Sequence, residues 1–226
     1  MGVKTLAVFE TDLALETGAR NDFTTTLQAQ YINSAYLDLC TRDTFWGLRF
    51  PVKYMFPELS VSTTVNTVAE RAWVTVPTDM IITETIHDTT NDVKLKGMAW
   101  RDYVRKTGRG DSDESGEPTH WVRRGGYYYL WPTPDAAYVL EVFYRKRPAV
   151  LSASTDVTVV GAEWDEAILK LAVIQTLMRF KDYESALVEK KEWMDMMASK
   201  VGIYTQELGD RGDFMKPSQA YHSWDY

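Results

Sequence analysis

Few residues in this chain have the types and spacing that catalysis or metal binding requires. The three histidines, His87, His120 and His222, lie far apart in sequence and show none of the spacings of a metal site. Residues 111–116 match the first half of an EF-hand calcium loop, but the twelfth position is Val122 instead of a bidentate Glu. We favour a solvated acidic loop over a calcium site there, and the sequence leaves metal binding by this loop open.

No nucleophile, base and orienting group can be assembled from the sequence. It lacks a Walker-type phosphate loop, a Gly-x-Gly-x-x-Gly turn that opens a helix, and a Gly-x-Ser-x-Gly elbow. Two Arg-Gly-Asp triplets, at 109–111 and 211–213, lie in glycine-rich polar segments where such triplets arise by chance. We therefore expect a protein that is not an enzyme and that uses no cofactor and no catalytic metal.

One run of aromatic residues could bind a ligand by stacking. Three consecutive tyrosines, from Tyr127 to Tyr129, lie between Trp121 and Trp131, and such rings stack on bases or sugars. Strand alternation sends about half of these rings inward, where aromatic side chains fill a core. An aromatic-lined binding module for sugars or single-stranded nucleic acid is therefore our alternative interpretation of the function.

Charge and composition narrow the class of protein. The 226 residues include 25 Lys and Arg against 32 Asp and Glu, which gives a net charge of −7. This balance disfavours broad binding of nucleic acid, which depends on neutralising phosphates, although DNA could slide past such a surface. No apolar run approaches the ~20 residues of a membrane span, and the first residues lack a signal-peptide core. Cys40, the single cysteine, stands at an apolar helical position, which predicts a buried thiol and a reducing site of synthesis.

Helical periodicity marks both ends of the chain. Residues 5–16 predict a short helix, and residues 24–26 predict the cap of a second helix that ends near Asp43. After Gly161 the 3.6-residue period returns in a helix that is apolar on two sides, and Asp182 predicts the cap of the last helix. The apolar stripe expected on that last helix is Tyr183, Leu187, Met194, Met197 and Val201.

Between these helices the period changes to two. Strands are predicted at 52–56, 72–77, 81–87 and 138–147, with a hairpin turning at Gly125 and Gly126 and a short helix at 97–106. The predicted fold is therefore α+β. It consists of a helical bundle formed by residues 1–50 and 155–205, an inserted antiparallel β-rich domain at 51–154, and an extended C-terminal tail at 206–226.

The order of motifs over residues 116–197 resembles that of the bacteriophage head-to-tail adaptor (connector, or neck) proteins. In that family a Gly-x-Pro strand leads to a hairpin, a Leu-x-Pro-x-Pro-Asp turn, a strand ending in Tyr-x-x-x-Pro and an Asp-x-Glu-x-Ala helix start. The matching runs here are Gly116-Glu117-Pro118-Thr119-His120-Trp121, Leu130-Trp131-Pro132-Thr133-Pro134-Asp135, Tyr144-Arg145-Lys146-Arg147-Pro148 and Asp182-Tyr183-Glu184-Ser185-Ala186.

The resemblance extends to the N-terminal part of the chain. The predicted helix at 27–43, the following Phe45-Trp46 pair and the run 73–79 also fit the family. Residues 80–113 depart from its pattern and leave the size and shape of the β insert open.

The resemblance implies a non-enzymatic structural protein of the virion, made in the host cytoplasm and located in the neck, at the head–tail junction. It implies a ring of about twelve copies beneath the portal protein. Such a ring extends the DNA channel and presents a platform for the next tail or nozzle component. Genomic DNA would pass through its lumen without sequence-specific binding, and no membrane would be involved.

Family members often stay monomeric until they meet the portal, and their C-terminal segments help to dock on it. By that analogy the candidate portal contacts are Phe214, Tyr221, Trp224 and Tyr226. Docking of this tail on its own domain is the alternative. The last two helices have spare apolar surface for contacts between copies, and the candidate interface residues are Trp164, Glu189, Trp193 and Met196.

Overall fold

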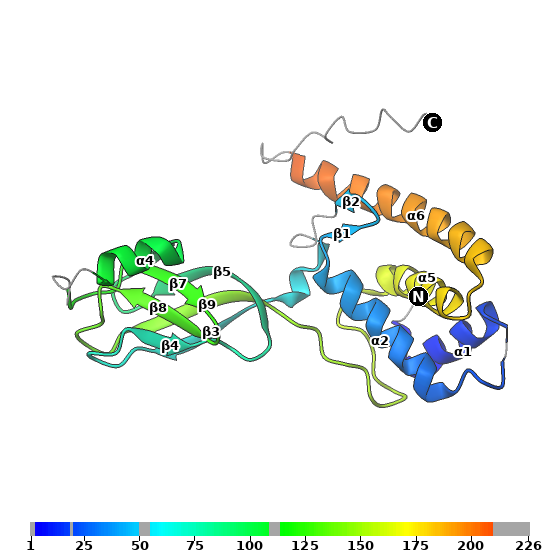
Figure 1. Cartoon of the computed structure of the whole chain (residues 1–226), viewed down its shortest axis with the longest axis horizontal. Coiled ribbons are helices and arrows are strands. Elements are labelled where there is room, and N and C mark those ends of the chain that lie inside the picture. The colour runs from blue at the N-terminus through cyan, green and yellow to red at the C-terminus, as the bar shows by residue number, and fades with distance from the viewer. Residues whose placement is uncertain (1–2, 19, 50–54, 109–113, 210–226) are drawn as a thin grey trace. The chain divides into compact units, whose positions relative to one another are not determined.

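A computed structural model describes residues 3–18, 20–49, 55–108 and 114–209 of the chain. Over these residues the chain forms five α-helices and a curled, mostly antiparallel sheet of seven strands (Figure 1), which confirms the predicted α+β class. The fold divides into two compact units. The helical unit contains the described residues of Met1–Met55 and Val150–Tyr226, and the β unit is Phe56–Ala149.

The helical unit begins with the two predicted N-terminal helices, α1 (Leu6–Glu16) and α2 (Thr25–Thr41). The Thr24 hydroxyl accepts a hydrogen bond from the Leu27 backbone N–H at 3.4 Å, so Thr24 caps α2 as the sequence predicts. Cys40 is fully buried on α2, which confirms the expected buried thiol. A short hairpin of β1 (Thr44–Phe45) and β2 (Leu48–Arg49) follows α2.

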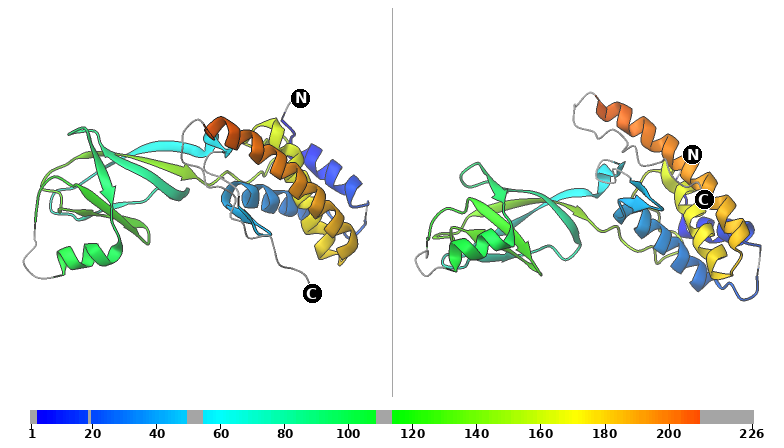
Figure 2. Two further views of the ribbon diagram at one scale, coloured as in Figure 1. Left: turned by 90° about the horizontal axis from the view of Figure 1, so that it is seen from above. Right: turned by 45° about the horizontal axis from the view of Figure 1, so that its top comes forward.

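The C-terminal helices are α5 (Asp165–Arg179) and α6 (Tyr183–Gly209), which run side by side (Figure 2). Helix α5 contacts α1, α2 and α6. This explains why it is apolar on two sides, as a helix packed between neighbours must be. Asp182 accepts a hydrogen bond from the Ser185 N–H at 3.2 Å, which confirms the predicted cap of α6.

An extended segment, residues 150–161, returns from the β unit along α1 and α2 and is fixed by side-chain hydrogen bonds. The buried Asn33 amide bonds both the N–H and the C=O of Leu151, at 2.8 and 2.9 Å. The Tyr36 hydroxyl accepts from the Val159 N–H at 2.9 Å. The Asp156 carboxylate accepts from the N–H groups of Ser152 and Ala153, at 2.7 and 2.8 Å. Because these bonds satisfy the backbone of an irregular segment, it can pack closely against the helices.

The sheet of the β unit has the strand order β3-β9-β5-β6-β7-β8-β4. All neighbouring pairs are antiparallel except β6 and β7, which are parallel. The strands are β3 (Ser60–Asn66), β4 (Trp73–Thr75), β5 (Met80–Asp88), β6 (Val93–Gly97), β7 (His120–Arg124), β8 (Tyr127–Trp131) and β9 (Val139–Lys146). The predicted hairpin between β7 and β8 turns at Gly125, whose φ of 60° is a conformation that glycine adopts without strain.

The core of the β unit lies on the concave side of the curled sheet. Leu140, Val142 and Tyr144 of β9 point into it, as the predicted alternation of that strand requires. Tyr128 and Leu130 of β8 reach the same core. Helix α4 (Trp100–Thr107) packs against β7 on the opposite face.

Parts of the β unit differ from the sequence prediction. Strands β3 and β6 were not predicted, and the predicted helix at 97–106 begins only at Trp100, because Gly97 still pairs with Trp121 in the sheet. Most of the predicted strand at 52–56, residues 52–54, lies outside the described residues.

Candidate partner-binding surfaces

Two of the predicted interface residues, Trp164 and Trp193, are buried inside the helical unit. Their exposed fractions are 1% and 0%. The Trp193 indole N–H donates to the Ala167 carbonyl at 2.9 Å, and its ring meets Trp46 edge-on at 5.3 Å. Both indoles are therefore committed to packing within this chain, and any contribution that they make to a contact between copies is indirect.

The other two predicted interface residues lie on α6 nearer the surface. Glu189 bonds the Lys170 ammonium group at 3.0 Å, and Glu192 bonds the same group at 2.8 Å. Burial alone lowers the pKa of Lys170, but the bonds to Glu192 and Glu189 outweigh it and raise that pKa above its ordinary value. Glu189 thus joins α6 to α5, whereas Met196 is half-buried.

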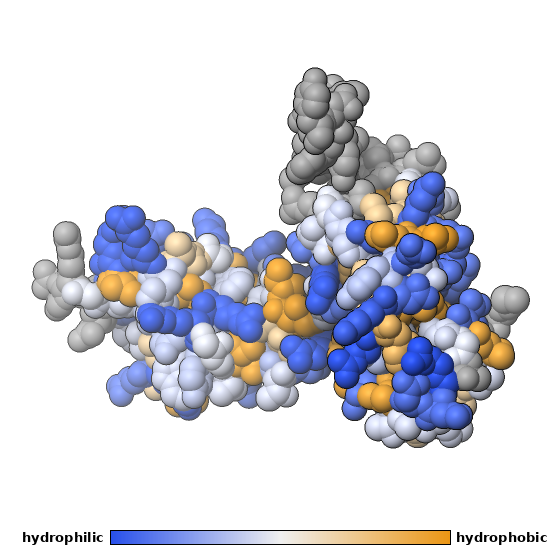
Figure 3. Space-filling view, turned by 45° about the vertical axis from the view of Figure 1, so that its right-hand side comes forward, coloured by the Kyte–Doolittle hydropathy of each residue, from blue (hydrophilic) through white to orange (hydrophobic). Residues whose placement is uncertain are grey.

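The apolar surface of α6 differs from the predicted stripe. Tyr183 and Leu187, expected to face the core, are 59% and 61% exposed, and Val188 beside them is 58% exposed. Met197 of the predicted stripe is buried, together with Ala186 and Trp193, and Met194 and Val201 are half-buried. Helix α6 has more apolar residues than α5 can cover, so its first two turns present apolar side chains to solvent. On the side shown in Figure 3, hydrophobic residues of the helical unit reach the surface among hydrophilic ones.

The predicted aromatic run of the β unit divides between the two faces of the sheet. Tyr128 lies in the core and packs edge-on against Trp121 at 5.6 Å. Tyr127, Tyr129 and Trp131 lie on the outer face. About half of the rings point inward, as predicted. The rings that point outward belong to a larger aromatic column.

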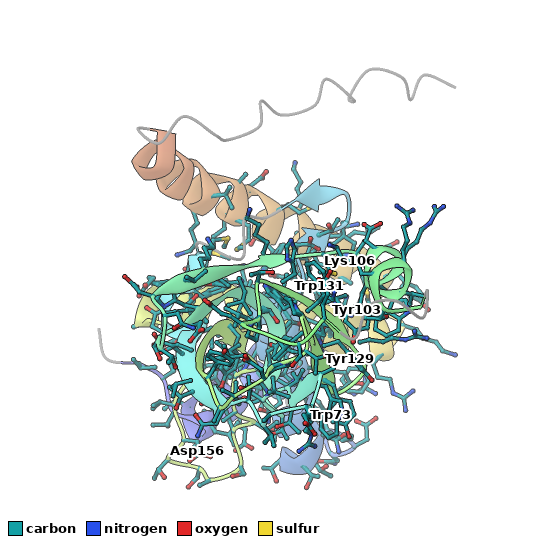
Figure 4. All side chains as sticks on the ribbon, turned by 90° about the vertical axis from the view of Figure 1, so that its left-hand side faces the viewer. Trp73, Tyr103, Lys106, Tyr129, Trp131 and Asp156 are labelled. Carbon is teal, nitrogen blue, oxygen red and sulfur yellow. The ribbon has the colours of Figure 1, made fainter. Side chains whose placement is uncertain are left out.

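This aromatic column runs along the outer face from β4 to α4. Trp73 contacts Tyr127 at 4.5 Å, and Tyr129 lies 5.2 Å from Trp100 and 5.6 Å from Tyr103, measured between ring centroids. In the view of Figure 4, Trp73, Tyr129 and Tyr103 are labelled one above another, with Trp131 and Lys106 above them. Such edge-on and tilted contacts between rings add stability beyond the area that they bury.

Three basic side chains lie over the tryptophans of this column. The Arg71 guanidinium is 3.3 Å from the Trp73 ring centroid, the Arg124 guanidinium is 4.1 Å from that of Trp100, and the Lys106 ammonium is 3.4 Å from that of Trp131. Periodicity does not predict the pairs of Lys106 with Trp131 and of Arg124 with Trp100, because the two residues of each pair are distant along the chain. Only Arg71 and Trp73 are close in sequence. The indole faces are consequently covered by cations, which weakens the alternative of an open platform for stacking bases or sugars.

The remaining predicted features fall in different places. The four tail aromatics, Phe214, Tyr221, Trp224 and Tyr226, lie outside the described residues, as does the first half of the acidic run at 111–116. Among the described residues, no group of three or more His, Cys, Asp or Glu is arranged to hold a metal ion. No described helix combines the length and apolarity needed to cross a membrane.

The sequence model of the family described as SU10 adaptor protein matches residues 4–219, nearly the whole chain. The chain belongs to this family. Its members are head-to-tail adaptor proteins of bacteriophages, which confirms the resemblance drawn from the motifs. No curated protein matches the chain.

Membership in the SU10 adaptor family suggests what the exposed surfaces are for. It indicates a structural, non-enzymatic role as a phage head–tail adaptor. It also implies association with portal and tail components and a place in the virion neck. An adaptor of this kind must offer several surfaces to different partners, and both units expose side chains suited to that task.

Proposed function

We propose that this chain forms a ring of about twelve copies beneath the phage portal, where it extends the DNA channel and docks the next tail or nozzle component. The match to the SU10 adaptor family over residues 4–219 is the observation that supports this most directly. In this proposal the helices at the two ends of the chain form the bundle that closes the ring. The β-rich domain between them forms the platform for the tail.

Contacts between copies require a surface that a lone chain leaves open. Tyr183, Leu187 and Val188 provide one, because each is more than half exposed and all three lie on the first two turns of α6. Burying an exposed Leu or Val side chain contributes about 1.5–3 kcal/mol. We therefore place the contact between neighbouring copies on this part of α6, with Glu189 and Met196 farther along the helix, and with Trp164 and Trp193 supporting it from the core.

Charge substitutions on α6 test this contact. Leu187→Asp combined with Val188→Asp should leave the isolated chain folded, since both side chains are exposed, and should prevent ring formation on the portal. Lys191→Asp, an exposed change on the same helix, is the matched control and should assemble normally. Glu189 is a poorer choice, because its substitution also breaks the bond to Lys170. A double variant that still closes rings would contradict the placement.

The tail from Gly209 to Tyr226 is the proposed portal contact, with Trp224 and Tyr226 as anchors, because buried aromatic side chains often dominate interface energies. Truncation after Gly209 should give a folded chain that no longer joins the portal, measured by co-sedimentation. If the truncated chain joined the portal as well as the full chain does, the tail would not be the docking segment.

A further inference from the structure

The part of the outer face formed by β4, β6, β7, β8 and α4 carries mostly basic side chains. Strands β4, β6, β7 and β8 contain no Asp or Glu, and α4 contains one acidic residue, Asp102. The same part of the face carries Arg71, Lys96, Lys106 and Arg124, and we call it the cationic face. Arg101 and Arg105 are exposed on α4, where Arg105 forms an ion pair with Asp102 at 3.8 Å. In a chain whose net charge is −7, this local excess of basic side chains stands apart from the average composition.

The arrangement of these groups concentrates positive potential around one histidine. Lys96 is the cross-strand neighbour of His120, and His120 lies 5.4 Å from the Trp131 ring over which Lys106 sits. Burial, then the charges of Lys106 and Lys96, lower the pKa of His120 below its ordinary value. Burial and the two ammonium groups therefore favour the neutral form of His120, and the ammonium groups themselves can attract an anion.

The cations of this face are held in place by the aromatic column. Arg71 and Arg124 are already stacked on Trp73 and Trp100, so they lose less side-chain entropy when a partner binds. A guanidinium stacked on a ring still has N–H donors along its edge, which match the oxygens of a phosphate. Within the described part of the chain, neither arginine forms an ion pair with a carboxylate.

The single sign of the face indicates the class of partner. Protein interfaces are poor in Lys and mix both charges, whereas clustered Lys and Arg on one face are the footprint of nucleic-acid binding. A base needs an accessible ring face on which to stack, but Trp100 already stacks on Tyr103 and has the Arg124 guanidinium over its ring. Contact with the phosphate backbone therefore fits this face better than contact with unpaired bases.

We infer that the cationic face is a weak, sequence-independent contact surface for the phosphates of duplex DNA. This inference rests on the proposed function, in which genomic DNA passes through the ring. Three or four cations per copy give weak binding, and the acidic remainder of the chain keeps it weak enough for DNA to slide. Repetition of the face around a ring would guide the duplex without holding it.

Fluorescence anisotropy with a labelled duplex of about 20 base pairs tests the inference on the full chain, at about 20 mM salt where phosphate contacts are strong. The test variant combines Arg71→Gln with Arg124→Gln. The control combines Lys146→Gln with Arg147→Gln, which removes the same charge from the end of β9 in the same unit. Thermal unfolding of both variants confirms that they are folded.

The test variant should bind the duplex about tenfold more weakly than the unmodified chain, and its salt dependence should fall by about two ions in a log–log plot. The control should change affinity less than about twofold. Equal weakening by both variants would overturn the inference, because only net charge would then matter. Tighter, salt-insensitive binding of a single strand would also overturn it, in favour of stacking. Stronger competition by polyglutamate than by duplex DNA would overturn it in favour of an acidic protein partner.

Mixing both variants with the portal separates this inference from the function on which it rests. If the unmodified chain and both variants join the portal but the test variant binds DNA normally, only the cationic face is contradicted. If none of the three joins the portal, the adaptor ring itself is contradicted, whatever the DNA measurement gives.

Discussion

The two units of this adaptor use tryptophan in opposite ways. In the helical unit, Trp164 and Trp193 are at most 1% exposed and fill the space between helices. In the β unit, Trp73, Trp100 and Trp131 are half-buried on the outer face and lie beneath basic side chains. The first arrangement stabilises a core, and the second fixes charged groups at a surface.

The units also differ in what they leave exposed. The helical unit exposes Tyr183, Leu187 and Val188, which gain free energy only when another surface covers them. The β unit exposes cations, which act at longer range and tolerate water. An apolar surface suits lasting contacts between copies, and a charged one suits a ligand that moves past. Substitutions that act on one unit alone test whether the two units differ in this way.

The largest effect is expected from Trp193→Ala. It removes a fully buried indole and its hydrogen bond to Ala167, which should destabilise the helical unit by about 4 kcal/mol. Urea unfolding measures the loss, and amide hydrogen exchange shows where it falls. Exchange should accelerate in α5 and α6 and stay slow in β9. Equal acceleration in β9 would show that the two units do not fold separately.

Leu140→Ala is the converse change in the β unit. Leu140 is fully buried in the sheet core, so the loss should be about 3 kcal/mol and confined to the strands. The same exchange experiment checks it, with slow exchange in α5 as the expected control.

Asn33→Ala should have an intermediate effect. It leaves the N–H and C=O of Leu151 without their side-chain partner in a buried place, at a cost of about 2 kcal/mol. The expected consequence is faster exchange over residues 150–161, measured with the β unit as internal reference. Unchanged exchange there would mean that the segment is held by its other bonds, such as that from Val159 to Tyr36.

The smallest effect is expected from Asp156→Asn and depends on pH. Backbone N–H groups of Ala153 and Ser152 hold the pKa of Asp156 below its ordinary value. The folded chain therefore gains stability from this carboxylate above its unfolded pKa of about 3.9, and loses it as the pH falls through the lower folded pKa. The variant should be less stable than the unmodified chain at neutral pH, and the two should converge in acid. Parallel urea-unfolding curves from pH 7 to acid would contradict this role.

Most elements of the fold could be predicted where the signal is local. The caps Thr24 and Asp182, the turn at Gly125 and the alternation of β9 each depend on neighbours in sequence, and each is present. Strand β6 was missed because only Leu95 in it is buried, so its five residues show no apolar pattern. Strand β6 is stabilised by its pairing with β5 and β7 and not by a strand pattern in its own sequence.

The surfaces were harder to predict than the elements. The stripe on α6 was right at Met197 but wrong over the first two turns, because spacing alone does not show which of two adjacent apolar rows faces α5. Tyr183 and Leu187 lie on the row that stays more than half exposed. The pairing of Arg124 with Trp100 depends on α4 packing over β7, a contact between segments that periodicity cannot connect.

Mass photometry of the purified full-length chain, alone and mixed with the portal ring of the same phage, tests the central claim most directly. The account predicts a monomer alone and about twelve added copies on each portal ring. A chain that stays monomeric in the presence of the portal, at concentrations where other neck proteins assemble, would contradict the adaptor ring.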